Sequence, residues 1–296
     1  MHVYSRLGTA KDFRAIAPRL LCRRYTIHHP FDTEMDYILP LTDLRLQVDQ
    51  WALLALVPGQ SRNFAKYTTV RSVTQYKSKI NEEHEKLLIV LDTPSFGASP
   101  GKTTYMVTDR GPNEYDIATR SSMNPPILPS SAGPPATFSP SSPEVRANDR
   151  IFVPGWEKYQ PVDIYQRKLK EEYYALCTVT PTSPMSLAQL AILLKAVSKH
   201  SVHYDLLKYQ CYWYAYTVWE VVRTYFRGAV TDDGLQRRRG KYKGVKIRRE
   251  DSVEAATEMY GRAWTMLCEK ETRTQQQEEA KILQVKFVVT IVYNIR

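Results

Sequence analysis

The sequence predicts an α+β fold, because several strand candidates are followed by longer helix candidates. Leu87–Leu91 is a continuous apolar run of strand length, and Thr103–Thr108 follows it after a loop rich in Ser, Gly and Pro. Together they predict a β-hairpin with a long loop. Tyr173–Val179 is a third strand candidate, and Phe64–Val73 fits either a short strand or the start of a helix. A helical alternative remains open for residues 78–92, where Glu and Lys are frequent.

Four segments are helix candidates. Leu39–Val57 is apolar and helix-like, and a Pro-Gly pair follows it as a stop signal. Ser186 and Gln189 form the S-x-x-Q pattern of a capping box before an apolar face. A strongly aromatic helix is expected to start near Cys211, and residues 250–285, rich in Glu, Gln and Ala, predict the last helix.

We interpret the chain as a single domain, 1–296, with segments of unlike composition. Residues 1–35 carry no clear period and predict a basic, partly ordered lead-in. Residues 111–150 are dominated by Pro, Ser, Gly and Asn, so they cannot bury enough apolar surface to offset the entropy of ordering. We expect a disordered insertion there, because neither flank looks complete alone. A basic loop over 228–249 and a helical extension over 250–296 complete the organisation.

The positive charge of the chain is concentrated in one segment. The formal net charge is +10, and eight Lys and Arg residues lie between Arg237 and Arg249. Such a run is typical of a mobile, solvated loop. It could also bind an anionic membrane surface or nucleic acid, or serve as a nuclear address, although no nucleic-acid recognition motif accompanies it. The candidate anion-binding residues are Arg237, Arg238, Arg239 and Lys241.

The four cysteines argue against disulfides and metal sites. Cys22, Cys177, Cys211 and Cys268 are far apart and form no C-x-x-C pair. The N-terminus lacks an apolar signal core, and no apolar run reaches the roughly 18 residues of a spanning helix. We therefore expect a cytoplasmic or nuclear protein with free thiols, no transmembrane segment, no metal and no cofactor.

Cys211 is the strongest candidate for chemistry. A thiol in the first turn of a helix lies in the positive field of the helix N-terminus, which favours the thiolate. The alternative is a structural cysteine packed beneath aromatic side chains, because Cys is among the most buried residue types. The aromatic residues around it could likewise line a substrate groove, but core packing fits better, since they lie all around one helix.

Thiol catalysis needs an imidazole close to the sulfur. His84 stands at the start of the apolar strand candidate, where a rigid dyad with a helix N-terminus could form. His200 and His203 are nearer to Cys211 in sequence and remain alternatives in the preceding loop. Asp109, at the end of the second strand candidate, could orient the imidazole or be a turn residue.

These residues resemble two groups of proteins. The order of a strand that opens with His, a second strand, a helix and a Y-x-L-L…C helix is similar to circularly permuted papain-like thiol enzymes of the NlpC and lecithin:retinol acyltransferase-like types. The matching positions are His84 and Tyr204, Leu206, Leu207, Gln210, Cys211 and Tyr214. The chain also resembles uncharacterised fungal proteins with an E-H-E strand and an N-C-x-W-x-A helix. Their matching positions are Glu83, His84, Glu85, Cys211, Trp213 and Ala215.

The resemblance covers roughly residues 80–110 and 173–227, and it has departures. Gln210 stands where the family has Asn, and Glu85 and Lys86 stand where it has an aromatic residue and Gly. The resemblance implies a papain-like, circularly permuted antiparallel sheet packed on helices.

The resemblance also implies an activity. Cys211 would attack an amide or ester carbonyl, with His84 as base, Asp109 as the orienting residue and a thioester as intermediate. Backbone N–H groups at the helix start would stabilise the oxyanion. The substrate-binding candidates are Tyr204, Gln210 and Trp213. The alternative function is a non-catalytic binding protein on the same scaffold, which would use the basic loop for anionic partners.

Overall fold

The computed structural model describes ten stretches of the chain. They are residues 43–57, 60–80, 84–94, 101–113, 145–154, 161–204, 210–232, 234–242, 245–246 and 250–294. All of them belong to one compact unit, Glu34–Arg296. The predicted lead-in, Glu83, Leu206 and Leu207 lie outside the described residues.

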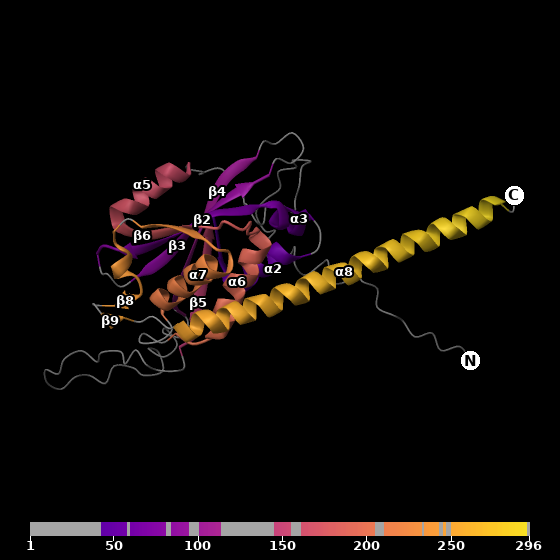
Figure 1. Cartoon of the computed structure of the whole chain (residues 1–296). Helices are drawn as coiled ribbons and strands as arrows, with labels where there is room; N and C mark the ends of the chain where they lie inside the picture. Colours follow the sequence, from indigo (N-terminus) through magenta and orange to yellow (C-terminus); the bar gives the residue numbers. More distant parts are fainter. Residues whose placement is uncertain are drawn as a thin grey trace, which may run out of the picture. The chain divides into compact units, whose positions relative to one another are not determined.

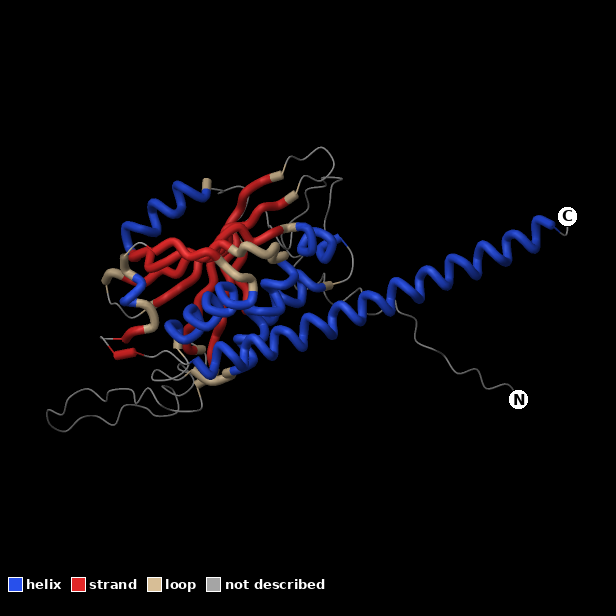
Figure 2. Tube along the Cα trace, in the orientation of Figure 1, coloured by secondary structure: helices blue, strands red, loops and turns tan. Residues whose placement is uncertain are grey.

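Seven of the described strands form one antiparallel sheet (Figure 2). Across the sheet their order is β1-β5-β4-β3-β2-β6-β7. Their bounds are Leu44–Gln47 (β1), Thr69–Ser78 (β2), Glu85–Thr93 (β3), Lys102–Pro112 (β4), Ala147–Val153 (β5), Tyr173–Thr180 (β6) and Ala229–Asp232 (β7). Two short strands, β8 (Lys241–Tyr242) and β9 (Val245–Lys246), pair separately.

The helices lie on both faces of this sheet (Figure 1). Their bounds are Val48–Leu56 (α2), Gln60–Tyr67 (α3), Val162–Glu172 (α5), Leu187–His200 (α6), Cys211–Tyr225 (α7) and Glu250–Asn294 (α8), with a 3₁₀ turn at Gln236–Arg238 (η4). α6 and α7 pack on one face, with α2 and the first part of α8 against them. α5 packs on the other face, against β4 and β6. We call these the α7 face and the α5 face.

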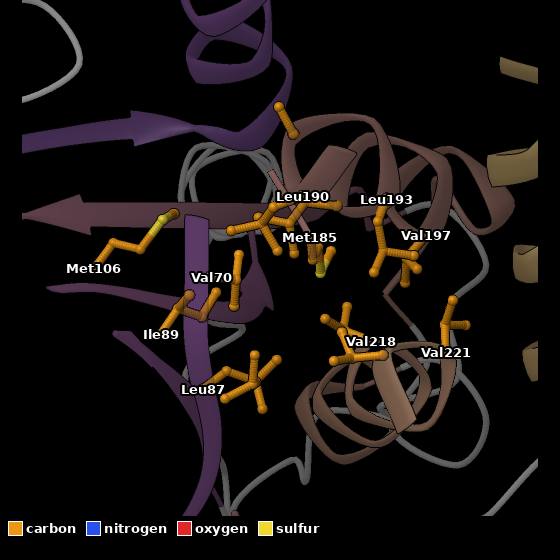
Figure 3. Packing of buried hydrophobic residues seen from close by; sticks show 14 of the residues in the cluster. Val70, Leu87, Ile89, Met106, Met185, Leu190, Leu193, Val197, Val218 and Val221 are labelled. Carbon is orange, nitrogen blue, oxygen red and sulfur yellow. The ribbon is translucent and has the colours of Figure 1, made fainter. Parts of the chain in front are cut away.

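The main core fills the α7 face. Alternate residues of β3 point into it, so that Leu87 and Ile89 meet side chains of α6 and α7 such as Leu190 and Val218 (Figure 3). The intervening residue, Leu88, belongs to a smaller core beneath α5. Residues 211–222 of α7 are buried all round, since the helix lies between the sheet, α6 and α8. The aromatic residues of this helix are therefore core residues.

Several sequence predictions are confirmed. β3 and β4 form the predicted antiparallel hairpin, and the helical alternative for residues 78–92 is wrong. β6 coincides with the third strand candidate. Ser186 caps α6 with the expected reciprocal hydrogen bonds to Gln189. α7 begins at Cys211, and α8 covers the predicted last helix.

Other boundaries need correction. The segment Leu39–Val57, predicted as one helix, contains strand β1 before α2 begins at Val48. The predicted insertion over 111–150 overlaps β4 at Pro112 and β5 from Ala147 onward, because these residues pair with each other across the sheet. The predicted loop over 228–249 contains the short strands β7, β8 and β9.

Within the stretches that the structure describes, every helix is too short or too polar to span a bilayer.

Candidate active site

Cys211 is the first residue of α7 and is closed to solvent. Its side chain is 1% exposed, beneath the fully buried Tyr212 and Trp213. Gln210 occupies the N-cap position without a side-chain capping bond, and the backbone of Tyr212 in the first turn donates a hydrogen bond to the sulfur. The predicted position of the thiol at a helix N-terminus is thus present in the structure.

Burial decides the protonation of this thiol. Desolvation raises the pKa of Cys211 to about 12, and the nearby charges of Glu85 and Asp109 add to the increase. Backbone hydrogen bonds from Glu85 and Tyr212 act in the opposite direction, because they favour the thiolate. The field of the helix terminus is therefore outweighed, and Cys211 is a neutral thiol at neutral pH.

His84 and Asp109 are brought together at the same end of the sheet. The imidazole Nε2 lies 2.9 Å from Asp109 Oδ2, and both side chains are partly exposed. Arg150 donates to both carboxylate oxygens of Asp109 at 3.0 Å, which leaves the carboxylate held from two sides. Although burial raises it, hydrogen bonds from His84 and Arg150 lower the pKa of Asp109 below its usual value. Asp109 therefore stays ionised and orients the imidazole.

The thiol and the imidazole are associated with opposite faces of the sheet. The sulfur receives a hydrogen bond from the backbone of Glu85, the residue that follows His84. The carboxylate of Glu85 is buried on the α7 face, whereas Lys86 pairs with Asp109 on the α5 face. The imidazole of His84 is hydrogen-bonded to Asp109, so this bond lies on the α5 face, as Lys86 does.

Glu85 is the centre of a buried polar cluster that the sequence analysis missed. Its carboxylate accepts hydrogen bonds from Gln75 and from the backbone of Gly240, and it lies 3.7 Å from the ammonium of Lys77. Arg239 bonds Gln75 at 2.8 Å and Glu220 of α7 at 3.2 Å. Burial raises the pKa of Glu85 to about 7 in spite of these partners.

A second buried pair lies beside the first turn of α7. Arg110 is fully buried, lies over the Trp213 ring at 4.9 Å and pairs with Asp149 at 3.3 Å. It also donates to the backbone oxygens of Ser201 and His203. Asp149 could have been located on a strand from the segment ANDRIFV, in which Asp149, Ile151 and Val153 alternate along the chain and all point into the core.

The predicted substrate-binding residues differ in access. Gln210 and Trp213 are buried, at 1% and 0% exposure. Tyr204 is partly exposed, and burial together with the neighbouring Cys211 raises its pKa. His200 stacks on Trp213 with 5.7 Å between ring centroids, and His203 is an exposed residue whose backbone pairs with Arg146.

The basic residues of the predicted anion-binding set are also unlike one another. Arg237 and Arg238 are exposed, and Arg238 lies over the Tyr174 ring. Arg239 is 2% exposed, and its guanidinium lies 3.7 Å from the centroid of the Trp219 ring, so it packs in the interior of the protein. The carbonyl of Lys241 accepts a hydrogen bond from Lys77, which ties this segment to β2.

Taken together, the site has a thiol at the N-terminus of α7, which packs on the sheet. A hydrogen-bonded His84–Asp109 pair lies at the strands β3 and β4 in the middle of that sheet.

Comparisons with protein-family models, with curated proteins and with solved structures give no match to this chain. The described residues also hold no group of three His, Cys, Asp or Glu side chains that could bind a metal ion.

Proposed function

We propose that the chain is a cysteine-dependent hydrolase or acyltransferase that acts on an amide or ester. The observation that carries this proposal is the hydrogen bond between His84 Nε2 and Asp109 Oδ2, beside the peptide that also contacts the sulfur of Cys211. An ionised carboxylate that accepts from Nε2–H leaves Nδ1 as the basic nitrogen of the ring. The proposed reaction requires Nδ1 to reach the sulfur, which is bonded to the backbone of the next residue, Glu85.

The reaction would proceed in two balanced steps. In the first step, the sulfur of Cys211 bonds to the carbonyl carbon while its proton passes to Nδ1 of His84. The imidazolium then protonates the amine or alcohol that leaves, and a thioester remains. In the second step, water or another acceptor gives a proton to His84 and attacks the thioester, which restores the thiol. The backbone N–H groups at the start of α7 would stabilise the oxyanion in both steps.

The high pKa of Cys211 constrains this scheme. Because the resting thiol is neutral, its proton must leave during the attack and not before it. Because Cys211 is 1% exposed, the substrate must also displace the side chains that cover it. We therefore expect the rate to be limited by the step in which the substrate reaches the sulfur and the thiol loses its proton.

An acylation assay tests the proposal. The full chain is incubated with 4-nitrophenyl acetate, and the acetylated peptides are identified by mass spectrometry. We expect acetylation at Cys211 that Cys211→Ala abolishes and that His84→Gln lowers by about 100-fold or more, as for removal of a general base. Cys268→Ala is the matched control, because Cys268 is a partly exposed thiol on α8 far from the pair in sequence. Acetylation of Cys211 at the same rate in His84→Gln would exclude His84 as the base.

The second candidate function is a non-catalytic binding protein on the same scaffold. The observation that favours it is the enclosure of Cys211 in the core, where a structural thiol needs neither base nor access. It predicts that the assay acetylates Cys268 and leaves Cys211 intact. A folded Cys211→Ser variant with unchanged stability and unchanged acetylation would then assign the thiol to packing alone.

A further inference from the structure

A cleft of about 580 Å³ opens on the α5 face of the sheet. It lies over β1, β5, β4 and β3, beside Tyr165 of α5. This volume falls within the roughly 300–1,000 Å³ of pockets that hold small organic ligands. Cys211 does not line it, but Asp109, the partner of His84, does.

One wall of the cleft is a row of polar side chains in register across four strands. Gln47 of β1 pairs with Arg150 of β5, Arg150 with Asp109 of β4, and Asp109 with Lys86 of β3. Since directly opposed residues of antiparallel strands share one face, these four side chains form a continuous polar strip. A ligand that lies along this strip would meet charged and amide groups in a fixed order.

The neighbouring row, two residues along each strand, is mainly apolar. Arg45 pairs with Phe152, and Phe152 with Val107. The guanidinium of Arg45 lies 5.6 Å from the Phe152 ring centroid, so it stands above the apolar row as a cation. The cleft thus offers an apolar floor beside a polar strip.

The charges that line the cleft do not balance. Arg45, Lys86 and Arg150 are cations, and Asp109 is the carboxylate among the lining residues. Asp109 is bonded by Arg150 and His84, so its single charge is shared among several cations. Lys86 lies over the Tyr173 ring at 3.6 Å, and desolvation lowers its pKa although Asp109 and Glu172 act in the opposite direction.

A further polar atom points to a ligand. Asn148 lines the same cleft, and its buried Oδ1 has no hydrogen-bond partner among the described residues. A buried acceptor without a donor costs free energy, and a ligand donor would satisfy it once the Asn148 side chain turns its oxygen toward the cleft.

We propose that this cleft binds a small organic anion with an aromatic or otherwise apolar body. Arg45, above the Phe152 ring, binds its anionic group, and Lys86 adds positive potential from the β3 side of the cleft. The floor of Phe152 and Val107 contacts its body, and Asn148 accepts a hydrogen bond. The inference rests on the rows of the α5 face and not on the chemistry of Cys211. The proposed anion binding and the proposed acyl transfer are therefore tested independently of each other.

Calorimetric titration of the full chain with 2-naphthoate tests the proposal. The neutral isostere 2-naphthamide measures the contribution of charge, and inorganic phosphate measures the contribution of the apolar body. We expect 2-naphthoate to bind at least about tenfold more tightly than either comparison ligand, as follows from one charge-assisted contact together with a buried ring. The Cys211→Ala variant should bind 2-naphthoate as the wild type does.

Variants locate the site. Arg45→Gln and Lys86→Met each remove a cation and keep much of the side-chain stem. Arg45→Gln should weaken 2-naphthoate binding by about 3- to 10-fold, and Lys86→Met should weaken it less, because Lys86 acts across the cleft without direct contact. Lys102→Gln removes an exposed cation at the far end of β4 and is the matched control. Equal affinity in all three variants would overturn the proposal, as would equal affinity of the wild type for the anion and the amide. Loss of folding in one variant is detected by circular dichroism, and the other then decides.

Discussion

The two faces of the sheet differ in how far their charged side chains are exposed to solvent. Glu85 and Arg110 are enclosed in the core at 0% exposure. Their chain neighbours His84 and Asp109, and Arg150 on the adjacent strand β5, are partly exposed. The difference arises from strand alternation, which sends successive side chains to opposite faces. Charges on the α7 face are fixed by burial and by their partners, and charges on the α5 face remain available to ligands and protons.

The largest expected effect comes from the buried arginine. Arg110→Gln leaves Asp149 in the core without its cation, and removal of one member of a buried pair typically costs about 3–5 kcal/mol. The matched variant, Arg150→Gln, acts on a side chain that is 42% exposed and should cost less than about 1 kcal/mol. Urea unfolding of the two variants measures the difference. Similar losses in both would contradict the contrast between the faces.

A smaller effect is expected from pH. Because burial raises the pKa of Glu85 to about 7 in the folded state, from an ordinary value of 4.5, the folded chain binds this proton more tightly than the unfolded chain. Glu85 then contributes stability that is present below pH 4.5 and is lost as pH rises toward 7, with a slope of up to about 1.4 kcal/mol per pH unit.

Glu85→Gln should remove this slope, and its single side-chain oxygen can keep the hydrogen bond from Gln75 or the one from Gly240. The free energy of unfolding, measured from pH 5 to pH 8 in wild type and variant, reports the change. Parallel curves for the two proteins would show that Glu85 titrates alike in the folded and unfolded states.

The smallest effect concerns the open face. In Arg150→Gln the carboxylate of Asp109 loses a cation but keeps His84, so its pKa should rise toward the ordinary value. A ¹³C NMR titration of the Asp109 carboxyl measures this shift. A fall in the Asp109 pKa would be inconsistent with the assigned role of Arg150.

The sequence was informative where a pattern was local. The capping box at Ser186, the apolar run of β3 and the start of α7 all follow from neighbouring residues. Asp109, expected from the sequence at a strand end beside the imidazole, does bond His84, but it lies inside β4. Strands β5 and β7 were missed because they lie in segments with the composition of loops and acquire their structure by pairing with distant strands.

The electrostatics of the site could not be obtained in this way. A helix N-terminus predicts a lowered pKa for Cys211, but enclosure by the surrounding core reverses the sign. The basic run likewise predicts exposed charge, whereas Arg239 folds back onto Trp219 and Gln75. Both outcomes depend on which distant elements of the chain cover a residue, and a local sequence pattern does not specify those elements.

The order of strands in the sheet also has a consequence for the assembly of the site during folding. β2, β3 and β4 are consecutive in the chain and adjacent in the sheet, so contacts such as His84 with Asp109 close over short loops. Cys211 must approach β3 from more than a hundred residues downstream, after β6 has returned to pair with β2. Since non-local contacts form slowly, we expect the imidazole and its carboxylate to meet early and the thiol to reach the backbone of Glu85 last.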